Sequence, residues 1–317
     1  MLKYQMKLQF KERMKKLLED NQDFEKFNKI IHIPPLNFIR CNTIKISPEE
    51  LKKRLEKKWQ IEQPFFQYPE IFLIKSQLLP GELGKSIEHL LGYYYVQELS
   101  SMLSILALEP KENELVLDLC ASPGSKTTQI AAKMNNTGTI IANDKDIGRI
   151  SILNANLERI GAANTIITRM DGVNLCERLK RINFKFDRIL VDVPCSGEGT
   201  LRSSPETFLM WNKNMIKYFS NLQRKLLTAA IPLLKQEETL VYSTCTHAPE
   251  ENEEVVSFAL EKFPELKLEE IKLPIKTREG IRIWNNKKFP EQINKCARIY
   301  PQDNNTEGFF IAKFVRK

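Results

Sequence analysis

The sequence has no long apolar run, no disulfide framework and few histidines. No stretch approaches the ~18 uninterrupted apolar residues of a membrane helix, and the N-terminus is charged from the start, unlike a secretory signal. The six cysteines are scattered without a CxxC pair, and there are only three histidines, which argues against a disulfide scaffold and a zinc site. We therefore expect a soluble, cytoplasmic protein with reduced thiols, no bound metal and no membrane association.

Two common phosphate-binding motifs are also missing. The chain has neither GxxxxGK[ST] nor GxGxxG, so binding of a di- or triphosphate is disfavoured. It has no internal repeat and no long Gly/Ser linker. With 317 residues, 42% of them hydrophobic and 28% charged, it has the composition of a globular protein and the length of a catalytic domain plus an accessory domain.

The excess of positive charge lies at the N-terminus. Residues 1–60 hold 15 Lys and Arg against 8 Asp and Glu, whereas the rest of the chain is almost balanced. A basic accessory domain is suited to contact phosphates. Taken singly, the clusters at residues 11–16 and 52–58 are better interpreted as solvated helix faces.

The first 75 or so residues predict a small α+β unit. A helix is expected over residues 4–30, ended by two prolines, and a strand over residues 37–46. Ser47 is a typical N-cap for a helix over residues 48–58, because Pro and two acids follow it. Short strands are expected within residues 60–75.

Further along the chain, short apolar strands alternate with helices. The apolar positions Ile150, Leu153, Leu157 and Ile160 are three and four residues apart, which marks one face of a helix. Such alternation predicts a mostly parallel sheet covered on both sides, with ligands at the carboxyl ends of its strands. The expected strands are residues 115–120, 138–144, 164–170, 186–194 and 238–245.

Three successive strand ends carry groups suited to an adenosine-bearing ligand. The first strand runs into the turn DLCASPGSKTT, where Pro123 and Gly124 allow close approach to a ligand, and a helix follows to about Lys133. Asp144 ends the second strand, where dinucleotide-type folds bind ribose hydroxyls, and Asp171 follows the third, where it suits an adenine amino group. Each acid alone is as well explained as a helix cap.

Two cysteines follow the next strands in unusual settings. The fourth strand ends DVPCSGEG, which combines Asp192 with the thiol of Cys195, a proline and two glycines. The fifth ends YSTCTH, and the acidic run after Cys245 predicts a helix N-terminus whose dipole favours a nucleophilic thiolate. The alternatives, core cysteines or zinc ligands, are weakened by these settings and by the wide spacing.

These segments resemble those of a known family. DLCASPGSKTT, DKDIGR, FDRILVDVPCSGEGT and YSTCTHAPEENEEVV look like the cofactor loop, the second-strand motif and the two cysteine motifs of the RNA 5-methylcytosine methyltransferases. That family includes the RsmB-like bacterial ribosomal enzymes and the Nop2/Sun enzymes. IRCNTIKIS and GYYYVQELSSM are also similar to family segments, so the likeness spans residues 37–315, and the compact chain is most like the archaeal tRNA methyltransferases.

The resemblance implies a class I methyltransferase fold that uses S-adenosylmethionine. Its Rossmann-like, seven-stranded mixed sheet would occupy residues 91–317, after an α+β RNA-binding domain over residues 1–90. The cofactor-binding residues it implies are Cys120, Ala121, Ser122, Pro123, Gly124, Ser125, Lys126, Asp144, Arg149, Asp171 and Asp192. The family loop usually has glycine where this chain has Ser125, which puts the approach of the backbone to the cofactor in question.

The resemblance also assigns the chemistry. Cys245 would add to carbon 6 of cytosine and make carbon 5 nucleophilic, while Asp192, ionised or protonated, would hold the base edge and offset charge at ring nitrogen 3. Cys195 would then help remove the carbon 5 proton and release Cys245. Lys126 is either a catalytic residue facing the active site or a support for the cofactor loop.

Two other functions remain open. A DNA cytosine-5 methyltransferase also uses a thiolate, but the TCT cysteine and the lack of a target-reading insertion argue against it. A non-catalytic RNA-binding assembly factor is disfavoured because both cysteines and Asp192 are present. We expect a monomer that acts on RNA, with tRNA favoured over rRNA.

Overall fold

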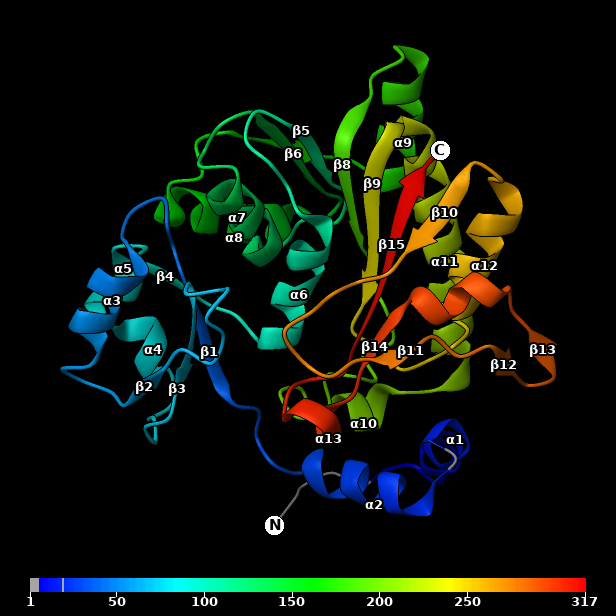
Figure 1. Cartoon of the computed structure of the whole chain (residues 1–317), viewed down its shortest axis with the longest axis horizontal. Coiled ribbons are helices and arrows are strands. Elements are labelled where there is room, and N and C mark those ends of the chain that lie inside the picture. Colours follow the sequence, from blue (N-terminus) through cyan, green and yellow to red (C-terminus); the bar gives the residue numbers. More distant parts are fainter. Residues whose placement is uncertain (1–5, 19) are drawn as a thin grey trace.

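The N-terminal part of the chain forms two helices and a small sheet (Figure 1). The computed structural model describes residues 6–18 and 20–317. The small sheet has the strand order β2-β3-β1-β4 and is antiparallel. The elements of this part are α1 (Leu8–Leu18), α2 (Asn21–Ile30), β1 (Asn37–Cys41), α3 (Pro48–Leu55), β2 (Ile61–Glu62), β3 (Ile71–Ile74), α4 (Glu82–Lys85), α5 (Ile87–Leu90) and β4 (Tyr94–Val96).

Two predictions for this part are wrong in detail. The single helix over residues 4–30 is two helices, because Asp20 has an extended backbone and its carboxylate caps α2 by accepting from the Gln22 N–H; residues 4, 5 and 19 lie outside the described residues. The strand that begins at Asn37 ends at Cys41, because Asn42 turns the backbone by accepting hydrogen bonds from Ile44 and Lys45. The helix after Ser47 and its cap are confirmed, although it ends at Leu55.

The helices α1 and α2 pack under the large domain, away from the small sheet. Figure 1 shows them beside α10 and α13. Phe10 of α1 meets Trp211 edge-on at 5.2 Å between ring centroids, and Phe27 of α2 meets His247 at 5.7 Å. These contacts place the first two helices directly beneath the segments that contain the predicted catalytic cysteines.

The remainder of the chain builds a large mixed sheet with helices on both faces. Its elements are α6 (Leu99–Leu108), β5 (Leu115–Asp118), α7 (Ser125–Lys133), β6 (Thr139–Asp144), α8 (Ile147–Ile160), β7 (Thr165–Arg169), α9 (Gly172–Arg181), β8 (Phe186–Asp192), α10 (Thr207–Met210), α11 (Lys213–Ala230), η1 (Ile231–Leu233), β9 (Leu234–Thr244), α12 (Glu253–Lys262), β10 (Leu266–Glu269), β11 (Arg278–Glu279), β12 (Ile283–Trp284), β13 (Lys287–Lys288), η2 (Glu291–Lys295), β14 (Ala297–Ile299), α13 (Pro301–Asn304) and β15 (Phe309–Arg316).

The predicted Rossmann-like mixed sheet is confirmed. Strands β7, β6, β5, β8 and β9 are parallel neighbours in that order, and β15 pairs antiparallel with β9. All five strands expected from the sequence are present. Within the described residues the sheet has nine strands rather than the expected seven, because the short strands β10, β11 and β14 extend the antiparallel edge beside β15.

Two apolar layers cover the sheet, as the alternating pattern predicts. One contains buried residues of α6, α7 and α8, and the other contains those of α9, α11 and α12 together with α1 and α2. On α8 the predicted face is confirmed, with Leu153, Leu157 and Ile160 buried and Ile150 half-buried. The carboxyl ends of the parallel strands are left open between these layers.

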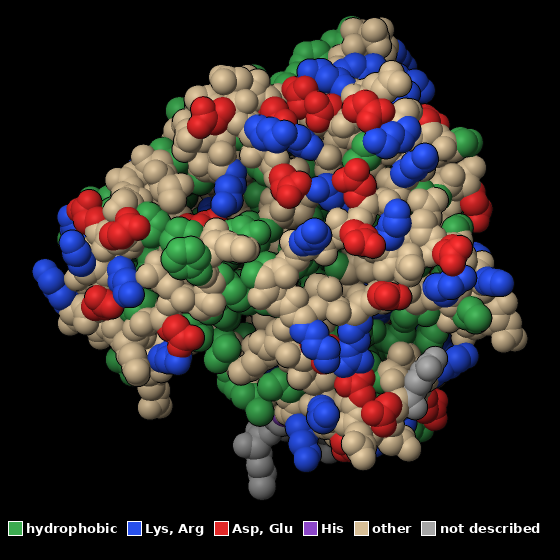
Figure 2. All heavy atoms as spheres, viewed as in Figure 1, with side chains coloured by type: hydrophobic (Ala, Val, Ile, Leu, Met, Phe, Trp, Pro, Cys, Tyr) green, Lys and Arg blue, Asp and Glu red, His purple; other side chains and the backbone are tan. Residues whose placement is uncertain are grey.

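The charge of the surface is distributed over both signs. Figure 2 shows basic and acidic side chains interspersed on the visible face. None of the helices in residues 6–18 and 20–317 is long and apolar enough to cross a membrane.

A buried arginine joins the small sheet to the large domain. Arg40 of β1 is 2% exposed, and its guanidinium donates to the Ser125 carbonyl at 2.8 Å and to Thr128 Oγ1 at 2.9 Å, both on α7. Burial lowers the pKa of Arg40 to about 10. The small sheet is thereby fixed to the helix that follows the predicted cofactor loop.

A second buried arginine joins the antiparallel edge of the large sheet to α12. Arg298 of β14 and Glu253 of α12 form two hydrogen bonds of 2.5 and 2.7 Å, and both side chains are almost fully buried. Removing one partner of such a pair leaves an uncompensated buried charge. The pair therefore holds β14 against the start of α12.

Arg298→Met should lower the free energy of unfolding by about 3–5 kcal/mol, the usual cost of breaking a buried ion pair. Arg224→Met is the matched control, since its 2.7 Å pair with Glu254 is partly exposed, and it should cost about 1 kcal/mol or less. Urea denaturation followed by circular dichroism measures both. Equal losses in the two variants would contradict the role given to Arg298.

Candidate active site

The loop between β5 and α7 is shaped by one glycine. Gly124 has a φ of 102°, and a Cβ at this position would come within 2.9 Å of Leu153 Cδ1. The Ala121 N–H donates to the Asn143 carbonyl at 2.8 Å, which ties the loop to the end of β6. Ala121 is buried, whereas Cys120 is half-buried, and burial raises the pKa of the Cys120 thiol. Cys120 is therefore a thiol and not a thiolate.

Ser125 fits where the family has glycine. It is the first residue of α7, in helical backbone, so the conformation does not require glycine. Its side chain is half-buried, and its carbonyl accepts the hydrogen bond from Arg40. The serine leaves the path of the loop unchanged.

The predicted ribose carboxylate lies at the end of β6. Asp144 is 6% exposed, and its carboxylate lies 3.2 Å from the Arg149 guanidinium of α8. Arg149 also donates to the Ser122 carbonyl at 2.6 Å, and Ser122 Oγ donates back to the Arg149 carbonyl at 2.8 Å. Asp144, Arg149 and Ser122 are thus brought together, with Pro123 next in the loop.

The carboxylate predicted to bind adenine, Asp171, caps a helix. Asp171 is exposed and is the N-cap of α9, where Oδ1 accepts from the N–H groups of Val173 at 3.1 Å and Asn174 at 3.2 Å. The cap explanation therefore applies to Asp171. It still stands at the same edge of the sheet as Asp144, because β6 and β7 are parallel neighbours.

A carboxyl missed by the sequence analysis lies under the loop. Asp118 ends β5 and is buried; Oδ2 accepts from Thr127 Oγ1 at 2.7 Å, whereas Oδ1 has no hydrogen-bond partner among the described residues. Burial raises the pKa of Asp118 to about 7, although the Thr127 hydrogen bond opposes the rise. A buried acceptor without a donor, beside the Gly124 turn and Asp144, fits the amino and hydroxyl donors of S-adenosylmethionine. Its position at a strand end was the signal that could have identified it.

Lys126 faces the fourth strand. Its Nζ lies 2.9 Å from Asp192 Oδ2 and donates to Ser101 Oγ at 2.9 Å. Burial opposes the charge on Lys126, but the attraction of Asp192 outweighs it and raises the pKa, with a further contribution from Cys245. Of the two roles left open, the structure places the amine in the cleft with Asp192. Ser101, on α6, gave no signal in the sequence.

Asp192 is fixed from two sides. Besides Lys126, it accepts a hydrogen bond from Ser243 Oγ to Oδ1 at 2.7 Å. Asp192 of β8 and Ser243 of β9 are register partners in the parallel sheet. The Ser243–Asp192 hydrogen bond thus holds together the ends of β8 and β9, which the two cysteines follow.

The two predicted cysteines are in contact. Cys195 Sγ and Cys245 Sγ lie 3.0 Å apart, and both thiols are free. The hydrogen bond with Cys245, together with burial, raises the pKa of the Cys195 thiol well above its usual range. Cys195 therefore keeps its proton in this state and can donate it as a hydrogen bond to Cys245.

The acidic run after Cys245 begins a helix, as expected, but the helix N-terminus is not adjacent to Cys245. Strand β9 ends at Thr244 and α12 begins only at Glu253, because the segment between them turns through side-chain bonds. Asn252 Oδ1 accepts from Thr244 Oγ1 at 2.7 Å, and Asn252 Nδ2 donates to the Thr246 carbonyl at 2.9 Å. Cys245 therefore lies in contact with Cys195 and not at a helix N-terminus.

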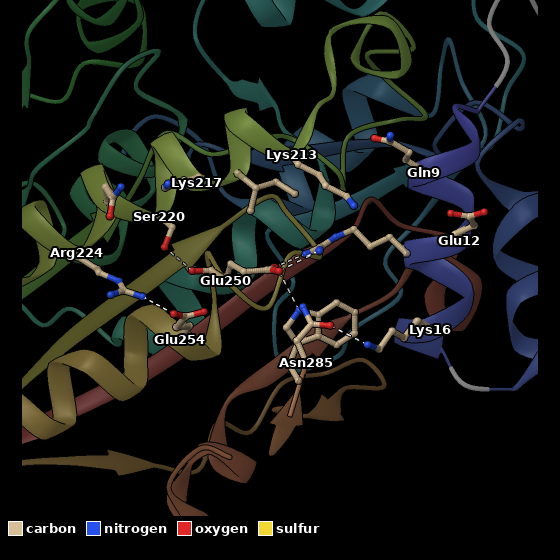
Figure 3. A pocket seen from close by; sticks show the side chains of 14 residues that line it. Gln9, Glu12, Lys16, Lys213, Lys217, Ser220, Arg224, Glu250, Glu254 and Asn285 are labelled. Atoms are coloured by element: carbon tan, nitrogen blue, oxygen red, sulfur yellow. Dashed lines mark hydrogen bonds and ion pairs between the residues drawn. The ribbon is translucent and has the colours of Figure 1, made fainter. Parts of the chain in front are cut away.

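A groove elsewhere on the molecule contains none of the predicted site residues. Figure 3 shows that it lies between α1, α11 and the β12–β13 hairpin, where Lys16, Lys213 and Glu250 are among its lining side chains. Two ion pairs, Arg13–Glu250 and Arg224–Glu254, lie among its lining residues. The predicted site residues instead lie at the carboxyl ends of β5, β6, β8 and β9.

Family models match nearly the whole chain. One described as 16S rRNA methyltransferase RsmB/F matches residues 105–315, and one described as the N-terminal domain of 16S rRNA methyltransferase RsmF matches residues 6–99.

Individual relatives are similar along the full chain. The tRNA (cytosine(49)-C(5))-methyltransferase of Pyrococcus abyssi is 43% identical over 314 residues, covering 98% of this chain and 98% of that protein. The ribosomal RNA small subunit methyltransferase F of Psychromonas ingrahamii is 37% identical over 307 residues, covering 96% of this chain but 62% of that protein. This chain therefore spans less than two thirds of the ribosomal relative.

Solved structures agree with these relatives. A methyltransferase homologue from Pyrococcus horikoshii has a TM-score of 0.83 at 33% identity, covering 95% of this chain and 92% of its own. NSun6 from Pyrococcus horikoshii, determined with SFG, has a TM-score of 0.83 at 27% identity and covers 98% of each chain. From the matched family models and the identity over nearly the full length, the chain belongs to the RsmB/F family of S-adenosylmethionine-dependent RNA cytosine-5 methyltransferases.

Proposed function

We propose that this protein methylates carbon 5 of a cytosine in tRNA through a covalent adduct between Cys245 and the base. The observation that carries this proposal is the 3.0 Å contact between the sulfur atoms of Cys195 and Cys245, beside the Lys126–Asp192 pair. A nucleophile, a second thiol, a carboxylate and a cation thus meet at adjacent strand ends. Cytosine C5 methylation needs such a set, because the ring carbon is too weak a nucleophile by itself.

Residues of three loops would hold the cofactor. Asp144 would accept from the ribose hydroxyls, Asp171 from the adenine amino group, and the loop from Cys120 to Ser125 would lie against the amino acid end. Asp118, with its buried unpartnered oxygen, joins this set. S-adenosylmethionine supplies a methyl group on a positively charged sulfur.

Activation of the base falls to Cys245 and Asp192. The Cys245 thiolate forms a bond to carbon 6, and the ring electrons move to make carbon 5 nucleophilic. Asp192 hydrogen-bonds the base edge, and the Lys126 ammonium offsets the negative charge that develops on the ring. The raised pKa of Lys126 keeps that ammonium charged.

Release of the product falls to Cys195. Cys195 first gives its own proton to solvent, and its thiolate then takes the proton from carbon 5. The double bond to carbon 6 re-forms and Cys245 leaves as a thiolate, so one proton is released for each methyl group transferred. Because Cys245 itself is the largest cause of the raised Cys195 pKa, formation of the carbon–sulfur bond removes that cause. The Cys195 thiol therefore ionises more easily after the attack, when its thiolate is needed.

Sequence identity favours tRNA over rRNA. The Pyrococcus abyssi tRNA enzyme is 43% identical to this chain, whereas the Psychromonas ingrahamii rRNA enzyme is 37% identical. rRNA is the second candidate, because the matching family models are those of 16S rRNA enzymes. The basic N-terminal domain, residues 1–90, would contact RNA phosphates, which makes binding sensitive to salt. Cytoplasmic location and a monomeric state stay predictions.

The substrate is tested directly with methyl-labelled S-adenosylmethionine. We expect label in tRNA, little in rRNA and none in duplex DNA, and bisulfite sequencing of the labelled RNA locates the cytosine. Label in rRNA alone would support the second candidate. Label in DNA, or in no nucleic acid at all, would contradict the proposed function.

The two cysteines should give opposite results when replaced. Cys195→Ala should trap a covalent enzyme–RNA adduct that survives denaturing electrophoresis, because the release step lacks its base. Cys245→Ala should form no adduct and no methylated RNA. Cys176→Ala is the control, since this buried cysteine lies on α9 away from the site. Normal turnover by the Cys195 variant, without adduct, would reject its assignment.

Asp144→Ala should weaken cofactor binding. Losing hydrogen bonds to a charged acceptor costs about 1.5–3 kcal/mol, or roughly 10- to 150-fold in Kd. Calorimetry with S-adenosylmethionine measures the change. Asp187→Asn is the control, because this carboxylate pairs with Lys235 near the amino end of β8. Unchanged affinity in the Asp144 variant would remove it from the cofactor site.

A further inference from the structure

The acidic residues that follow Cys245 point in different directions. Glu250 and Glu254 line the groove of Figure 3, where they pair with basic side chains. Glu251, between them, is 0% exposed and has its polar contacts on the opposite side, with the segment that carries Cys195. The acidic run is therefore divided between the groove, which Glu250 and Glu254 line, and the Cys195 segment, which Glu251 contacts.

Glu251 bonds the residue after Cys195 directly and reaches the residue before it through Gln223. Its Oε2 accepts from the Ser196 N–H at 3.0 Å and from Gln223 Nε2 at 2.8 Å. Gln223, on α11, also donates to the Pro194 carbonyl at 2.9 Å. One carboxyl and one amide thus hold the backbone immediately before and after the thiol.

Burial of the Glu251 carboxyl opposes folding. Glu251 has no ion pair within the part of the chain that the structure describes, and its Oε1 has no hydrogen-bond partner there. Burial raises the pKa of Glu251 to about 8, against the opposing effect of the Ser196 hydrogen bond, and Glu198 adds to the rise. Burying a carboxyl lowers the free energy of unfolding unless hydrogen bonds offset the loss of water. The hydrogen bonds of Glu251 with Ser196 and Gln223 are therefore the reason to look for a functional role.

Cys245 is held by other means. It follows the long central strand β9, whose end pairs with β8 through Ser243 and with β15 through Thr244. Its carbonyl accepts from the Gly199 N–H at 2.9 Å. Since strand β9 fixes the residues directly before Cys245, we expect loss of the Glu251 carboxyl to displace Cys195 more than Cys245.

We propose that Glu251 is a positioning residue for the release step, holding the Pro194–Ser196 segment so that Cys195 stays against Cys245 and the base. The proposal rests on the proposed function, because it concerns the step that Cys195 performs there. Glu251 touches neither the thiol nor the substrate, and it acts through the Ser196 amide and Gln223.

Glu251→Ala should lower kcat by about 10- to 100-fold, the scale expected for a displaced catalytic group. The KM for RNA should fall together with kcat, because a slowed release step lets covalent enzyme–RNA adduct accumulate during turnover. Single-turnover kinetics and denaturing electrophoresis measure both. Glu254→Ala is the matched control from the same segment, and it should release product normally.

Glu251→Gln separates positioning from folding. The glutamine carbonyl can still accept from the Ser196 N–H, so this variant should accumulate less adduct than Glu251→Ala and recover part of kcat. Circular dichroism and urea denaturation check that each variant is folded. If Glu251→Ala does not fold, Glu251→Gln and Gln223→Ala carry the test, and adduct accumulation is expected in Gln223→Ala as well.

A double variant decides whether Glu251 acts through Cys195. In the Cys195→Ala background, Glu251→Ala should leave both the rate and the final amount of adduct unchanged, since the release base is already gone. Slower adduct formation in this background would overturn the proposal, as would normal release by Glu251→Ala alone. If Cys195→Ala itself traps no adduct, the proposed function fails instead, so the two failures are distinguishable.

Discussion

The contact between the sulfur atoms of Cys195 and Cys245 is the constraint on which the site depends. Fifty residues separate the two thiols in sequence, and they meet because β8 and β9 are parallel neighbours whose ends are aligned at Asp192 and Ser243. A shift of one residue in this register would turn the side chains to the other face of the sheet. The Ser243–Asp192 hydrogen bond fixes the register where the chemistry takes place.

The surroundings of the cysteine pair come from distant parts of the chain. From below, Arg13 of α1 lies 3.5 Å from Glu198 of the Cys195 loop and also pairs with Glu250, beyond Cys245. On the cofactor side, Arg40 of β1 holds the start of α7. The N-terminal residues are thus built into the base of the site as well as forming a separate sheet, and contact with RNA at this end of the chain would lie close to the chemistry.

The parts of the fold that depend on local pattern were predictable. The parallel strands, the buried face of α8 and the Ser47 cap follow from periodicity and capping, which act over a few residues. The single N-terminal helix and the closeness of the α12 N-terminus to Cys245 were wrong, because Asp20 and Asn252 use their side chains to turn the backbone. A side chain that competes for backbone hydrogen bonds is not visible in hydrophobic spacing.

The sequence by itself determined the family and predicted that the loop after β5 and both cysteines lie at strand ends, because these features belong to contiguous motifs. Only the tertiary structure decided that Lys126 faces Asp192, that Asp171 caps a helix, and that Glu251 holds the Cys195 segment. The difference has a physical cause. Strand periodicity and turn residues are local properties, whereas the partner of a charged side chain is set by which strands and helices the core brings together.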